Sequence, residues 1–146
     1  MLSWQETIRD CAALARQCFV DEEAQPSVAV IENASAKTPR EATLIFRRGG
    51  GSLSRDLAQR QGTFSLLIEC WAYAEDSSEA NQELEDLENH VLELLNEFVS
   101  RTRRERGLQV DLSVSVQPDG DFFRPAVASQ LSVEFRWRVR RPVTPL

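Results

Sequence analysis

The sequence is poor in the residues that most often carry chemistry. Its 146 residues include a single histidine, His90, and three cysteines, Cys11, Cys18 and Cys70. An odd number of cysteines excludes a framework in which every cysteine is paired, and no Cys-x-x-Cys pair or Cys/His spacing typical of zinc sites is present. We therefore expect buried, reduced thiols in a cytosolic protein. No catalytic or metal-binding role is expected for His90, because the spacing implies no serine or cysteine partner.

Several other signatures are missing. No run approaches the ~20 apolar residues of a membrane span, and the first six residues lack the basic-then-apolar layout of a signal peptide. The run Gly49-Gly50-Gly51 is not followed by the Lys-Ser/Thr of a phosphate-binding loop. The net charge of −6 argues against a general nucleic-acid binder, which needs a basic surface. We expect no enzyme activity, no cofactor and no metal ion.

The chain is organised around one strand that runs into one long amphipathic helix. The segment from Phe64 to Ala74 has a period of two, which predicts a strand. After a polar break at residues 75–78, apolar residues recur every three or four positions, which predicts a helix; they are Ala80, Leu84, Leu87, Val91, Leu94 and Phe98. The other side of this helix carries an acidic stripe, which consists of Glu79, Glu83, Asp86, Glu93 and Glu97.

Shorter patterns predict the remaining elements. Ser3 and Glu6 form a capping box that starts a helix running to Phe19. Strands are predicted at residues 27–33, 42–47, 108–117 and 131–140, and the last two are expected to pair antiparallel. Gly107 is expected to end the long helix. The chain therefore predicts a single α+β domain over residues 1–146, with a mixed, mostly antiparallel sheet of about five strands and two main helices packed on one face.

Three segments are candidates for contacts with other molecules. Residues 47–62 are rich in glycine and arginine and predict a mobile loop, with a short helical turn at residues 54–59. The apolar face of the long helix widens at Leu92, Leu95 and Val99, which either lie deeper in the core or contact a neighbouring subunit. The arginines that follow this helix either complement its dipole or touch phosphate; they are Arg101, Arg103, Arg104 and Arg106. Arg136 and Arg138 of the last strand are assigned to the subunit interface, because exposed strand edges need a covering neighbour.

The order of these elements resembles that of the tail terminator, or tail-completion, proteins of long-tailed bacteriophages. The similarity is carried by the strand from Phe64 to Ala74, by the helical sequence Ala80-Asn-Gln-Glu-Leu-Glu-Asp-Leu-Glu-Asn-His-Val91 and by the two closing strands. It implies a homo-oligomeric ring, typically of six subunits, that caps the tail tube, stops its elongation and offers a surface to the head–neck connector. DNA passes through such a ring without specific binding. The resemblance also implies a location in the virion tail, and in the bacterial cytoplasm during assembly.

The resemblance further implies a contact between the predicted loop and the tail tube protein. The residues expected to make it are Arg47, Arg48, Arg55 and Arg60, with Gly49, Gly50 and Gly51 permitting rearrangement on docking. Three alternatives stay open. They are another neck or baseplate component of a phage-like injection machine, a small-molecule-binding α+β module with a closed apolar pocket, and a hydrolase built on His90.

Overall fold

The computed structural model describes residues 2–19, 28–33, 41–50, 54–55, 58, 60–118 and 126–139. Along them follow α1 (Trp4–Phe19), β1 (Ala29–Glu32), β2 (Thr43–Arg48), β3 (Ser54–Arg55), β4 (Gln61–Tyr73), α2 (Ser77–Arg106), β5 (Leu108–Pro118) and β6 (Ala126–Val139). The strands form one sheet in the order β1-β2-β4-β6-β5, with β3 paired to β4 beside this path. β1 and β2 are parallel, and the other pairings are antiparallel. The predicted α+β class is confirmed, with six described strands in place of about five.

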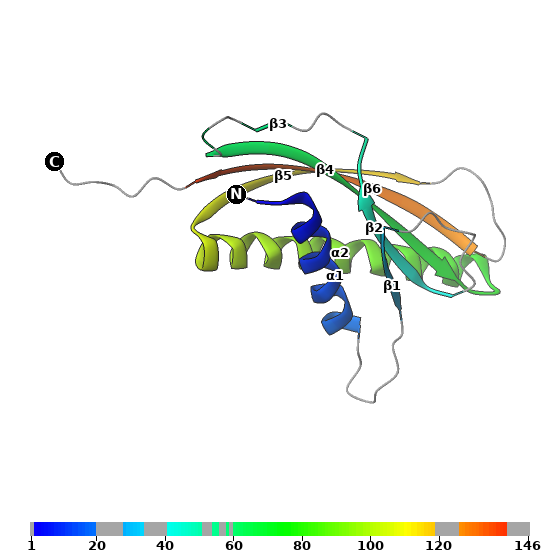
Figure 1. The fold of residues 1–146 in the computed structure, drawn as a ribbon. Coiled ribbons are helices and arrows are strands. Elements are labelled where there is room, and N and C mark those ends of the chain that lie inside the picture. The colour runs from blue at the N-terminus through cyan, green and yellow to red at the C-terminus, as the bar shows by residue number, and fades with distance from the viewer. Residues whose placement is uncertain are drawn as a thin grey trace.

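Both helices lie on the same side of the sheet, which gives two layers (Figure 1). α1 packs mainly against β1 and β2, and α2 packs against β4, β5 and β6. We call the other side of the sheet the open face, because neither described helix covers it. This face is not wholly polar, since Ile45, Trp71 and Ala128 form a small buried cluster on it, with Ile31 beside them.

The centre of the sheet is the antiparallel pair of β4 and β6, which stay in register over all thirteen residues of β4. Alternate side chains of this pair point toward the helices and form the main core. The rings of Phe64 and Phe135 stack across the two strands with centroids 5.0 Å apart, and Phe98 of α2 meets Phe135 edge-on at 5.9 Å. Such aromatic pairs contribute about 0.5–1.5 kcal/mol beyond their buried area, so they join α2 to the middle of the sheet.

Caps at both ends explain the length of α2. The Asp76 side chain accepts a hydrogen bond of 2.8 Å from the backbone N–H of Ser78. Gly107 ends the helix in the left-handed conformation, with a φ of 63°, which glycine adopts without the usual Cβ penalty. The helix stop at Gly107 is therefore confirmed. The prediction that four arginines follow the helix is wrong, because the helix continues to Arg106 and they lie in its last turns; they are Arg101, Arg103, Arg104 and Arg106.

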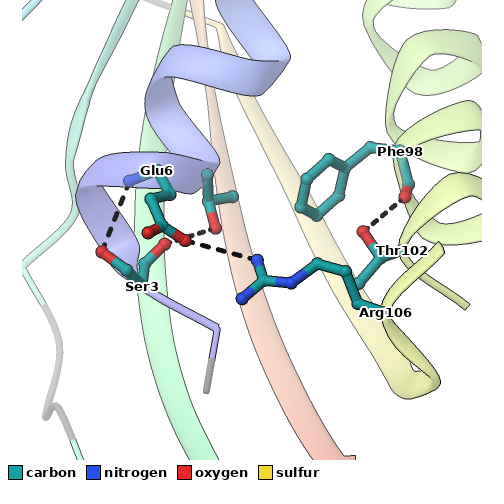
Figure 2. Close-up of polar contacts among 6 residues, drawn as sticks. Ser3, Glu6, Phe98, Thr102 and Arg106 are labelled. Atoms are coloured by element: carbon teal, nitrogen blue, oxygen red, sulfur yellow. Dashed lines mark hydrogen bonds and ion pairs between the residues drawn. The ribbon is translucent and has the colours of Figure 1, made fainter.

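The start of α1 lies against the end of α2 (Figure 2). The backbone N–H of Glu6 donates to Ser3 Oγ at 3.4 Å, which confirms the predicted helix start. Figure 2 shows Arg106 reaching toward the Glu6 carboxylate, and the two groups are 3.3 Å apart. Thr102 is buried nearby and donates a 2.8 Å hydrogen bond to the Phe98 carbonyl, so its hydroxyl is satisfied within the helix.

The prediction of a mobile loop at residues 47–62 is wrong at both ends. Arg47 and Arg48 are the last residues of β2, and β4 begins at Gln61. The predicted helical turn is also wrong at its start, because Ser54 and Arg55 form β3. β2 and β3 pair with the same edge of β4, so pairing to a long neighbouring strand orders residues whose own composition suggests a loop.

Two of the glycines in this region lie at close contacts. A Cβ added to Gly49 would lie 2.9 Å from Ser65 Cβ, and the Gly49 N–H donates to the Ser65 carbonyl at 2.9 Å. A Cβ added to Gly62 would lie 2.6 Å from Nε1 of the Trp137 indole. Gly51 lies outside the described residues. Glycine at positions 49 and 62 therefore permits close approach between neighbouring strands.

We predict that Gly62→Ala lowers the free energy of unfolding by about 1–3 kcal/mol, because the buried Trp137 ring must shift to admit the methyl group. Urea denaturation followed by circular dichroism measures the change. Gly50→Ala is the matched control, since nothing lies within 4 Å of a Cβ added there. Equal stability of the two variants would contradict the close contact at Gly62.

Candidate functional site

The open face carries a groove of about 800 Å3 at the end of the sheet where β3, β4, β6 and β5 lie side by side. We call it the arginine groove; its lining includes Ser54, Arg55, Gln61, Thr63, Asp111, Glu134, Arg136 and Arg138. The groove is open to solvent, and its lining is mostly polar or charged. Drug-sized apolar molecules bind instead in enclosed, mostly apolar pockets, so the groove is better suited to the polar surface of a macromolecule.

Strand register explains how residues far apart in the sequence meet in this groove. Arg136 of β6 lies opposite Thr63 of β4, and Arg55 of β3 lies opposite Gly62 of the same strand. β4 therefore brings β3 to one of its edges and β6 to the other. The sequence analysis assigned Arg55 to the tail tube and Arg136 to a subunit contact, whereas the structure places both in one groove.

Hydrogen bonds orient the two arginines of β6. Arg136 Nε donates to Glu134 Oε1 at 2.7 Å, and Arg138 Nε donates to Gln109 Oε1 at 3.0 Å. The Arg136 side chain nevertheless remains 71% exposed. A guanidinium has five N–H donors, so each of these groups can still bind a carboxylate of a partner.

The residues predicted to contact the tail tube do not share one surface. Arg47 lies on the open face, where its Nε is 3.5 Å from Glu69 Oε2. Arg48 lies on the helix side, with its guanidinium carbon 4.5 Å from the centre of the Trp4 ring. Arg60 is exposed immediately before β4, and its carbonyl accepts a 2.7 Å hydrogen bond from Val139 N–H. A partner that contacts the open face can therefore reach Arg47 but not Arg48.

The subunit interface predicted on α2 is wrong at one of its residues. Leu95 is 1% exposed and belongs to the main core, so it cannot contact another subunit. Leu92 is 36% exposed, and Val99 is half-buried at the margin of the core. At about 100° per residue, Leu92 and Val99 lie on one flank of the helix and Arg101 lies on the other. Because Arg101 lines a pocket shared with α1, the flank that bears Leu92 and Val99 faces the β5 side.

The outer edge of β5 continues this apolar flank. β5 pairs with β6 on one side, and no described strand pairs with its other edge. Val114 is half-buried and Val116 is 44% exposed. Counted from Gly107, Val114 lies ~24 Å along β5 and Leu92 lies ~22 Å back along α2, so the two are at similar distances from the turn that joins α2 to β5. We call the four residues Leu92, Val99, Val114 and Val116 the apolar edge strip.

The acidic stripe of α2 is exposed at all of its residues, which are Glu79, Glu83, Asp86, Glu93 and Glu97. Glu97 is 2.9 Å from Arg101 and 3.8 Å from Arg104, so the C-terminal end of the stripe is partly neutralised within the helix. Within the described part of the chain, Glu79 and Glu83 form no ion pair. The N-terminal half of α2 therefore presents carboxylates to solvent that no basic side chain of the described residues pairs with.

The described residues contain no group of three His, Cys, Asp or Glu side chains that could hold a metal ion. His90 is exposed, and its Nδ1 lies 2.7 Å from the Asp86 carbonyl oxygen, to which it donates. All three cysteines are free, but Cys18 is exposed, so the expectation of buried thiols is wrong for this residue. No described helix is both long and apolar enough to cross a membrane.

The sequence matches no protein-family model and no curated protein. Function must therefore be inferred from the arginine groove, the apolar edge strip and the acidic stripe. Sequence patterns indicated the arginines and the stripe but missed Val114 and Val116, since only the strand order shows that β5 is an edge. The alternation of the last strand placed Glu134, Arg136 and Arg138 on one side of it, and this pattern could have predicted a charged surface there.

We predict that the native protein reacts with about one equivalent of a thiol reagent per chain at pH 8, at Cys18, and the denatured protein with about three. Burial, with a smaller effect of the Glu88 charge, raises the pKa of the Cys70 thiol from an ordinary value of 9.0 to about 12. Burial also raises the pKa of Cys11. Both thiols ionise in the unfolded chain near pH 9 but not in the folded one, so their stabilising contribution falls as the pH rises from 9 toward 12.

Reaction with an Ellman-type reagent, followed by absorbance, measures the number of accessible thiols. Cys18→Ser is the control. It should abolish the fast reaction of the native protein, while Cys11 and Cys70 should still react in denaturant and give about two equivalents. A second fast equivalent in the native protein would contradict the burial of Cys11 and Cys70.

Proposed function

We propose that this protein is a structural subunit of a phage or prophage tail, which closes into a ring that caps the tail tube. The ring stops tail elongation and provides the surface on which the head–neck connector joins. Support comes from the resemblance of the element order to tail terminator proteins, together with one observation of this fold. That observation is the unpaired outer edge of β5 with the apolar edge strip beside it.

An exposed strand edge of this length can pair with a strand of another chain. β5 has eleven residues, and its outer backbone N–H and C=O groups face no described strand. Natural proteins protect such edges with charged residues, prolines or bulges. β5 carries one charged residue, Asp111, and a proline only at its last position, so residues 112–117 lack this protection. A second copy that covers the edge and the strip removes both the open backbone groups and the exposed apolar surface from water.

The two outer strands of the sheet differ, so a contact between the β5 side of one copy and the β1 side of the next is not symmetric. β5 is eleven residues long and antiparallel to its neighbour, whereas β1 has four residues and is parallel to β2. A copy that uses one side of the sheet to contact the other side of the next copy makes a head-to-tail interface. Such interfaces close into rings when the rotation between copies divides a full turn.

This proposal assigns fewer residues to the contact with the tail tube than the sequence predicted. Arg47 and Arg60 are the candidates for the tail tube protein, because Arg47 lies on the open face and Arg60 is exposed immediately before β4. Arg48 is left out, since it packs on Trp4 on the helix side. DNA passes through the ring without being bound in a sequence-specific way.

We predict that Val116→Asp prevents ring formation and tube capping, because a carboxylate at this position must be desolvated in the interface. Electron microscopy of the protein mixed with tail tubes from the same genome counts capped ends, and light scattering measures the size of the assembly. Val139→Asp is the matched control, since Val139 is 42% exposed against 44% for Val116 but lies outside the apolar edge strip.

The expected result is that Val139→Asp caps tubes as the unmodified chain does, while Val116→Asp leaves tube ends open and stays monomeric. Capping by Val116→Asp at the unmodified level would contradict the role of the β5 edge. An unmodified chain that neither assembles nor binds tubes at any concentration would contradict the proposed function itself. Binding to a baseplate or neck assembly with no binding to tube ends would favour the other tail-component alternative.

A further inference from the structure

We propose that the arginine groove of one copy receives the acidic stripe of α2 from the next copy. The proposal deepens the ring function above, on which it rests, by naming the two charged surfaces that meet at each subunit contact. It adds a polar contact to the apolar one at the β5 edge. Its partner is a second copy of this chain.

The first observation is the excess of arginine over acidic side chains at one end of the open face. Arg55, Arg136 and Arg138 line the groove together with two carboxylates, Asp111 and Glu134, of which Glu134 already accepts a hydrogen bond from Arg136. Arg136 and Arg138 are held by hydrogen bonds from Nε of 2.7 and 3.0 Å, which reduces the conformational entropy that a partner contact must remove. The groove is therefore a prepared site for carboxylates in a chain whose net charge is −6.

The second observation is the composition of α2. From Ser77 to Ser100 the helix contains seven acidic residues and no lysine or arginine. Glu79 and Glu83 are exposed, one helical turn apart, and make no ion pair among the described residues. Charge complementarity of this kind sets the orientation and the rate of association more than its strength.

The spacing of the two sets of charges also matches. Residues two apart on a strand project from the same side ~7 Å apart, which is the interval between Arg136 and Arg138. Residues four apart on a helix lie ~6 Å apart, which is the interval between Glu79 and Glu83. The two guanidinium groups can therefore each meet one carboxylate when the helix lies along β6.

The arrangement of the layers makes this contact one between copies. Figure 1 shows α2 on the side of the sheet away from the open face, so the helix that bears the stripe and the strands that line the groove are separated by the sheet. A chain cannot place its own stripe in its own groove. Two different surfaces on opposite sides produce a head-to-tail interface, which is the kind that a ring requires.

The experiment uses two charge-reversed chains and their mixture. The groove variant carries Arg136→Glu and Arg138→Glu, and the stripe variant carries Glu79→Arg and Glu83→Arg. Sedimentation velocity at low salt measures self-association, and circular dichroism checks that each variant is folded, as expected for exposed positions. A control with Arg9→Glu and Arg48→Glu has the same charge change as the groove variant, at exposed positions outside the groove, the stripe and the apolar edge strip.

We expect each variant alone to associate at least about tenfold more weakly than the unmodified chain, and the control to associate normally. An equimolar mixture should recover association, because the reversed groove of one variant then meets the reversed stripe of the other. A chain that carries all four substitutions should also recover self-association. Association of the unmodified chain should weaken as salt rises from 0.05 to 0.5 M, because the contacting charges are screened.

Lack of rescue in both the mixture and the fourfold variant would overturn the pairing of these two surfaces. So would an unmodified chain that stays monomeric at low salt. A different pattern would assign the groove to a polyanion. In that case the unmodified chain binds DNA or heparin, the groove variant does not bind it, and mixing the two variants does not restore association.

Normal rings and capped tubes from the groove variant would overturn this inference while the proposed function stands. Charge-swap rescue with tubes left uncapped would overturn the function and leave the contact.

Discussion

The register between β4 and β6 is the constraint on which the rest of the structure depends. Thirteen consecutive pairs fix which side chains of the two strands face the helices and which face away. Because side chains alternate, a slip of β6 by one residue would turn Phe135 outward, away from Phe64, and bury Arg136 under α2. The aromatic contacts of Phe98 with Phe135 and the charged lining of the arginine groove are therefore two consequences of the same pairing.

Most of the fold could be predicted because its periodicity is local. The alternation of residues 64–74 and the helical spacing that follows identify the central strand and helix without any tertiary information, and the cap at Gly107 marks the helix end. The parts that were missed have no apolar pattern of their own. β3 and the first residues of β4 are glycine, arginine and polar residues, and they are strands because a long neighbour pairs with them. The last turns of α2 remain helical because no residue before Gly107 interrupts the helix.

The candidate site was less predictable, because it depends on how separate elements meet. Leu92 and Leu95 are three residues apart on one helix, and the sequence cannot tell which of them the sheet covers; the structure buries Leu95 and leaves Leu92 at the margin. The arginines were visible in the sequence, but their grouping was not. Arg55 and Arg136 share a groove only because β4 separates β3 from β6, and Arg48 leaves that side because strand alternation turns it toward Trp4.

The apolar edge strip and the charged surfaces would have complementary effects in an assembly. Burying apolar area stabilises by about 25 cal/mol per Å2, and this attraction is not directional. Apolar burial alone would therefore allow two β5 edges to meet in a symmetric pair, which stops growth at two copies. In such a pair the open face of one copy does not meet α2 of the other, so Arg136 and Glu79 form no ion pair between copies. Head-to-tail contact between the groove and the stripe would add a directional attraction, because the two charged surfaces belong to the two different layers of this fold.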